Sequence, residues 1–114
     1  MTKRKEDQYM INLTNLNEGL FKDVADYWNE DTPMMTLEEC GALIKTLSKY
    51  ERFLKRSHPD MKPYEIEEKF EILRDDLIEK IRDVYISLEA IKIQYGIDDN
   101  VLNELIEEKL NKKY

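Results

Sequence analysis

The chain has 114 residues, of which 25 are acidic and 18 basic, and its formal net charge is −7. This length supports one domain with a single modest core, and the acidic excess argues against nucleic-acid binding, which needs clustered Lys and Arg. One cysteine and one histidine exclude an intrachain disulfide and the usual zinc sites.

No apolar run is long enough to span a membrane, so we expect a cytoplasmic protein with neither membrane nor nucleic-acid partners. Charged residues make up 38% of the chain, while three Gly and three Pro leave few natural breaks. This profile favours long amphipathic helices. We predict an all-α fold, with a flexible N-terminal segment over residues 1–11 and a single helical domain over residues 12–114.

The first predicted helix begins near Asn12 and ends near residues 29–31, with Pro33 stopping it. Tyr27 and Trp28 are expected to pack between this helix and the next. The apolar residues recur at steps of three and four: Leu13, Leu16, Leu20, Phe21, Val24, Tyr27 and Trp28.

The second predicted helix begins at Thr36. Thr36 and Glu39 have the spacing of a capping box, in which the hydroxyl and the carboxylate each accept a hydrogen bond from a backbone N–H. Residues 57–63, with His58 and two prolines, are predicted to form a connector. The expected core stripe of this helix is Cys40, Leu43, Ile44, Leu47, Tyr50 and Leu54.

The third predicted helix is the longest, beginning at Pro63 and closing at Gly96 in a left-handed cap. Asp98 or Asp99 then caps a fourth helix, whose apolar side runs from Val101 to Leu110. Because the third helix is longer than its neighbours, part of its apolar surface is left uncovered, and we expect the chain to self-associate. The third helix's predicted core positions are Ile66, Phe70, Leu73, Leu77, Ile81, Val84, Leu88 and Ile91.

Two acidic patches lie within the second and third predicted helices. One contains Glu38 and Glu39, and the other contains Glu79 and Asp83. Carboxylates three residues apart share a helix face, and two such pairs on facing helices can supply the oxygen ligands that Mg²⁺ prefers. A metal held in this way can activate water to cut a triphosphate.

Residues 28–31, 34–50 and 83–97 resemble the MazG-like family, particularly its short, phage-type members, and the likeness covers most of residues 28–113. The resemblance implies a four-helix bundle-like fold completed by assembly into dimers or tetramers. It also implies Mg²⁺-dependent hydrolysis of nucleoside triphosphates to monophosphate and pyrophosphate. The family's signature is EExxE on one helix and ExxD on the next long helix, followed by a C-terminal Glu-Lys pair, here Glu108 and Lys109.

The departures from this signature fall on the implied metal ligands. Glu38 and Glu39 are present, but Ala42 takes the third acidic position; Asp83 is present, but Lys80 replaces the glutamate. The net charge of the implied metal site changes from about −4 to about −1. In a partly buried site, a unit charge at about 4 Å changes the interaction energy with a bound ion by roughly a few kcal/mol. We therefore expect a catalytically degenerate homologue with a nucleotide-binding or regulatory role.

The candidate residues divide by role. Glu38, Glu39 and Asp83 are the candidate catalytic residues; Glu39, Glu79 and Asp83 are the candidate Mg²⁺ ligands; Lys80 and Lys109 are the candidate nucleotide contacts.

Three other interpretations remain open. The chain could be an active Mg²⁺-dependent pyrophosphohydrolase in which Glu38 and Glu79 fill the missing positions. It could instead be a small phage or prophage protein that binds and inhibits a host protein. Without the resemblance, Glu38 and Glu39 are explained as first-turn carboxylates that complement the helix dipole.

Overall fold

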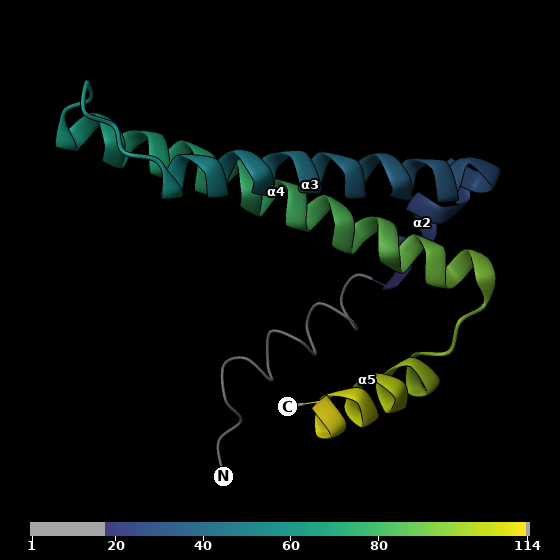
Figure 1. Cartoon of the computed structure of the whole chain (residues 1–114). Coiled ribbons are helices and arrows are strands. Elements are labelled where there is room, and N and C mark those ends of the chain that lie inside the picture. The colour runs from purple at the N-terminus through teal and green to yellow at the C-terminus, as the bar shows by residue number, and fades with distance from the viewer. Residues whose placement is uncertain (1–17, 114) are drawn as a thin grey trace, which may run out of the picture. The chain divides into compact units, whose positions relative to one another are not determined.

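The computed structural model describes residues 18–113, and every element in that range is helical (Figure 1). The elements are α2 (Glu18–Trp28), the 3₁₀ turn η1 (Asn29–Asp31), α3 (Thr32–Lys55), α4 (Pro63–Tyr95) and α5 (Asp99–Lys113). The predicted all-α class is confirmed. None of these helices combines the length and apolarity needed to cross a membrane. The predicted flexible segment, residues 1–11, and the start of the first predicted helix lie outside the described residues.

The chain divides into two compact units. In the described range, the first unit contains α2, η1, Thr32, the end of α4 from residue 89, and α5. The second unit contains α3 from Pro33 and α4 up to Leu88, and it forms a helical hairpin. The single domain expected over residues 12–114 stays a prediction.

The turn between α2 and α3 depends on Asn29. Its φ is 49°, in the left-handed region that Asn tolerates better than most residues, and this conformation ends α2. The Asn29 carbonyl oxygen accepts hydrogen bonds from the Thr32 hydroxyl at 2.7 Å and from the Gln94 side-chain amide at 2.9 Å. Tyr27, just before this turn, is 87% exposed, so the prediction that it packs between two helices is wrong.

α3 begins four residues earlier than predicted, at Thr32. Pro33 occupies its first turn, where the N–H that proline lacks would have no helical partner anyway, so this residue opens a helix rather than stopping one. Thr36 and Glu39 lie inside the helix, and the predicted capping box is wrong. The Thr36 hydroxyl instead donates a hydrogen bond to the Ser87 carbonyl oxygen on α4, at 3.5 Å.

Both ends of α4 follow the sequence prediction. It begins at Pro63, and Gly96 follows its last residue with a φ of 62°. The N–H groups of Gly96 and of the next residue donate to carbonyl oxygens of the last turn at 3.2 and 2.9 Å, which is a Schellman motif. The Asp98 carboxylate accepts the N–H of Asn100 at 2.8 Å, so Asp98 caps α5.

α3 and α4 run side by side in opposite directions (Figure 1). Thr36 meets Ser87 near one end, and the Phe53 ring meets the Phe70 ring edge-on near the other, with centroids 4.9 Å apart. The same number of residues separates these two contacts on both helices, so the layers between them can be assigned. Less exposed residues alternate at steps of three and four, as in a coiled coil. The layers of this seam are Thr36/Ser87, Glu39/Val84, Leu43/Lys80, Thr46/Leu77, Tyr50/Leu73 and Phe53/Phe70.

Much of the stripe predicted as the core of α3 lies on the surface instead. Ile44 is 69% exposed and Leu54 is 51% exposed. The seam lies one residue before these exposed positions and includes the small polar residues Thr36, which bonds to Ser87 of α4, and Thr46, which is buried. In an antiparallel helix pair, residues just after the seam on both helices lie on one side. They form here an exposed apolar face: Leu37, Ile44, Leu47, Ile78, Ile81, Tyr85 and Leu88.

Candidate functional site

The hairpin brings four of the motif positions to one level: Glu39, Ala42, Lys80 and Asp83. The layer assignment places Glu39 and Asp83 within about 1.5 Å of each other along the hairpin axis, and all four within about 6 Å. All four residues are half-buried. Glu39 and Lys80 lie in the seam itself, and Ala42 and Asp83 flank it on the side opposite the apolar face. We call these residues the four-position cluster.

The two charged residues that α4 gives to this cluster have partners on their own helix. Lys80 Nζ lies 3.7 Å from an Asp76 carboxylate oxygen. Asp83 accepts a hydrogen bond from Arg82 Nε at 3.0 Å, and Arg82 Nη2 lies 3.0 Å from the same carboxylate oxygen in an ion pair. The Glu39 side chain makes no hydrogen bond or ion pair with any other residue in the described part of the chain.

The two residues expected to replace the missing carboxylates are not brought together. Glu38 and Glu79 are both exposed, and the layer assignment separates them by about 9 Å along the axis. The dipole explanation of Glu38 and Glu39 also fails, because α3 begins at Thr32 and neither glutamate lies in the first turn.

The residues of the four-position cluster do not fit Mg²⁺. This ion takes six ligands at short distances and needs carboxylate charge to offset its dehydration. The cluster supplies Glu39 and Asp83, the second already paired with Arg82, while Lys80, whose ammonium group lies 3.7 Å from Asp76, adds a positive charge to the adjacent layer. Between residues 18 and 113, no group of three or more His, Cys, Asp and Glu residues is placed to hold a metal ion.

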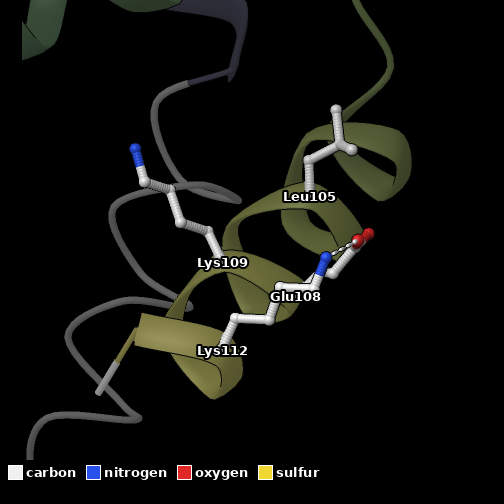
Figure 2. Close-up of a pocket in the computed structure, with 4 residues that line it drawn as sticks. All are labelled: Leu105, Glu108, Lys109 and Lys112. Carbon is white, nitrogen blue, oxygen red and sulfur yellow. Dashed lines mark ion pairs between the residues drawn. The ribbon is translucent and has the colours of Figure 1, made fainter.

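Lys109 belongs to α5, in the unit that does not contain Lys80. It lines a shallow hollow beside Leu105, Glu108 and Lys112. Glu108 and Lys112 form an ion pair at 3.6 Å, and Lys109 points away from it (Figure 2). The four-position cluster is therefore built from the hairpin alone.

The sequence interpretation missed a second polar site, at the loop end of the hairpin. An open hollow of about 260 Å³ on the surface has a wall rich in cations, and we call it the basic hollow. The spacing of Lys49, Arg52 and Arg56, at steps of three and four, was a usable signal, because it places Lys49 and Arg52 on one face of α3 and Arg56 directly after its last residue, Lys55. The lining residues are Lys49, Arg52, Phe53, Arg56, His58, Lys69 and Leu73.

His58 is held firmly against the wall of the basic hollow. Its ring stacks on the Phe53 ring with centroids 4.0 Å apart and an interplanar angle of 24°. Nε2 lies 2.7 Å from the Phe53 carbonyl oxygen, and because a carbonyl only accepts, Nε2 carries the proton and donates. The predicted placement of His58 in the connector is confirmed.

No protein-family model matches the chain, and neither a curated protein nor a solved structure is significantly similar to it.

Proposed function

We propose that the chain is a MazG-like nucleoside triphosphate pyrophosphohydrolase homologue that has lost hydrolysis and acts by binding nucleotide or by regulation. The observation that carries the proposal is the convergence of the EExxE and ExxD positions at one level of the hairpin. The contacts that set this register, Thr36 with Ser87 and Phe53 with Phe70, involve no motif residue. The convergence is therefore independent support for the motif assignment.

The loss of hydrolysis follows from two of the four residues. Ala42 offers no ligand, and Lys80 brings a positive charge to the level where the family holds a cation. The natural residues would then not retain Mg²⁺, and no metal-activated water would form. An ammonium group in this position still attracts phosphate oxygens, so binding can outlast catalysis.

The first test is pyrophosphate release from a panel of NTPs and dNTPs, with and without Mg²⁺ or Mn²⁺. We expect none from the natural protein and metal-dependent release, or at least Mn²⁺ binding, from the Ala42→Glu, Lys80→Glu variant. Lys45→Glu is the matched control, because it adds an acid at an exposed position of α3 outside the cluster. Release by the natural protein that disappears in a Glu39→Gln, Asp83→Asn variant would identify an active enzyme instead.

Nucleotide binding is tested separately by calorimetric titration. We expect heat of binding with the natural protein and a weaker affinity in Lys80→Met, which keeps the aliphatic stem and removes the charge. Absence of heat with every nucleotide of the panel would contradict a nucleotide-binding role.

We also propose that the apolar face packs against the same face of a second copy, which would make a four-helix assembly. Leu37, Ile44 and Leu47 on α3 are seven and three residues apart. Ile78, Ile81 and Tyr85 on α4 are three and four residues apart. Both spacings keep the set on one helix face that can pack against another helix. A standard interface buries about 800 Å² per partner. Seven large side chains exposed by 39% to 69% supply surface on that scale.

Sedimentation of Ile44→Glu tests this assembly. We expect a dimer or tetramer for the natural protein and a monomer for the variant. Ile72→Glu is the control, because Ile72 is 64% exposed but lies on the other side of the seam. A monomeric natural protein would contradict self-association, and capture of a host protein that Ile44→Glu abolishes would then favour the inhibitor interpretation.

A further inference from the structure

The basic hollow concentrates positive charge on a chain whose net charge is −7. Lys49, Arg52, Arg56 and Lys69 line it, and no carboxylate does. None of these four cations is in an ion pair or hydrogen bond with another residue of the range 18–113. Other basic side chains of the same hairpin, such as Lys55 and Lys80, have acidic partners.

Uncompensated cations that share one cavity repel one another, and an anion between them removes that repulsion. The arginines add fork-shaped donor groups that match the oxygens of a phosphate, whereas the lysines act as point charges. The hollow therefore has the charge and the donor geometry of an oxyanion site.

Packing and a hydrogen bond hold the apolar floor and the His58 ring of the hollow in place. Leu73 is buried at 8% exposure and Phe53 is half-buried, so the floor is apolar and packed. The Phe53 stack and the bond to the Phe53 carbonyl oxygen fix the His58 ring, which leaves Nδ1 as the unbonded ring nitrogen. Cations come from α3, from the loop and from α4, so the site exists only in the folded hairpin.

We propose that the basic hollow binds a small, multiply charged phosphate, either free or as the phosphate end of an organic molecule. Its volume of about 260 Å³ lies below the roughly 300–1,000 Å³ of pockets that enclose whole drug-sized ligands. One or two phosphate groups fit this size better than an entire nucleotide does. Lys49, the lining residue nearest the four-position cluster, is separated from Lys80 by about 9 Å along the axis, so this site does not rest on the proposed function.

The test uses His58 as a reporter. It is the only histidine in the chain, so its ring signals in a nuclear magnetic resonance spectrum need no assignment. Adding sodium pyrophosphate to the natural protein should shift these signals to saturation, while sodium chloride at equal ionic strength should not. Comparing inorganic phosphate with a nucleoside monophosphate, and with the parent nucleoside, distinguishes a free from an organic phosphate.

Two double variants locate the site. The double variant Arg52→Gln, Lys69→Gln should lower the affinity for pyrophosphate at least tenfold. The control variant Lys45→Gln, Arg74→Gln removes the same charge from exposed positions outside the hollow, and its affinity for pyrophosphate should be unchanged. Lys80→Met should not change the His58 shifts that pyrophosphate causes. A failure of this phosphate-site proposal can therefore be told apart from a failure of the proposed nucleotide-binding function. Helix content by circular dichroism confirms that each variant folds.

Three results would overturn the proposal. They are an absence of saturable shifts, equal affinity in the two double variants, and tighter binding of a short single-stranded oligonucleotide than of pyrophosphate through the same residues. The last result would replace a small-anion site with a nucleic-acid surface.

Discussion

Replacing Phe70 with alanine tests the register on which the four-position cluster depends. The Phe70 ring lies 4.9 Å from the Phe53 ring at 79° and 6.0 Å from the Tyr50 ring at 62°, centroid to centroid. Both contacts have the edge-to-face geometry that aromatic pairs favour. Truncating a fully buried Phe costs about 3–5 kcal/mol, and since Phe70 is half-buried we expect a loss of about 2–3 kcal/mol in the free energy of unfolding.

The assay is urea unfolding followed by circular dichroism, at one fixed protein concentration because self-association would couple stability to concentration. The control is Ile72→Ala, two residues along the same helix. Ile72 is 64% exposed, so its truncation should change stability by no more than about 0.5 kcal/mol.

A double-mutant cycle with Phe53→Ala then isolates the contact itself. We expect a coupling free energy of about 1 kcal/mol between Phe53 and Phe70. No coupling, or equal effects of Phe70→Ala and Ile72→Ala, would refute the register. A slip by one heptad would move Glu39 about 10 Å from Asp83 along the axis and would separate the cluster.

Three further predictions concern the first unit. Gly96→Ala should destabilise the chain by about 1 kcal/mol in urea unfolding, because φ is 62° and a new Cβ meets no atom within 4 Å, which leaves backbone strain alone. Burial lowers the pKa of Lys92, but bonds to Asp99 and Glu89 outweigh it and raise that pKa above 10.5. The stabilisation that Lys92→Met removes should therefore be full below pH 10.5 and vanish as the pH rises through the folded-state pKa, as measured by unfolding across that range. Asp98→Ala should lose an N-cap worth about 1 kcal/mol and speed amide hydrogen exchange in α5.

Helix ends that depend on local rules could be predicted from the sequence. Pro63 opens α4, Gly96 closes it with a positive φ, and Asp98 caps α5. Each of these features depends on residues within one turn, so no knowledge of distant contacts was required. The start of α3 was predicted wrongly: Thr36 and Glu39 have the spacing of a cap, but Thr32 and Pro33 open the helix a turn earlier.

The face of α3 that packs on α4 could not be predicted from hydrophobicity. Two stripes run along this helix one residue apart, and the more apolar one, with Ile44 and Leu47, is exposed. The buried stripe includes Thr36 and Thr46 because Ser87 and Leu77 lie opposite them in the layers. That match is a property of two helices together, and neither helix shows it alone.

The four-position cluster and the basic hollow also differ in how far the sequence predicts them. The motif residues around Glu39 and Asp83 could be found from the sequence because each motif lies on one helix. The basic hollow combines Arg52 of α3, His58 of the loop and Lys69 of α4, and folding alone brings them together. Among the lining cations, only those contributed by α3 have a helical spacing that can be recognised in the sequence.

Glu39 and Lys80 are the charged residues of the seam, in adjacent layers between Thr36/Ser87 and Thr46/Leu77. A charge in a coiled-coil seam costs stability, and its best-attested benefit is to fix register or oligomeric state. Register in this hairpin is already set by the Phe53–Phe70 ring contact at one end and by the Thr36 hydrogen bond at the other. Two apolar residues in these layers would make a more stable hairpin with the same alignment. The cost of Glu39 and Lys80 is therefore not offset by the fold alone, and it is an argument for the binding role that we propose at the four-position cluster.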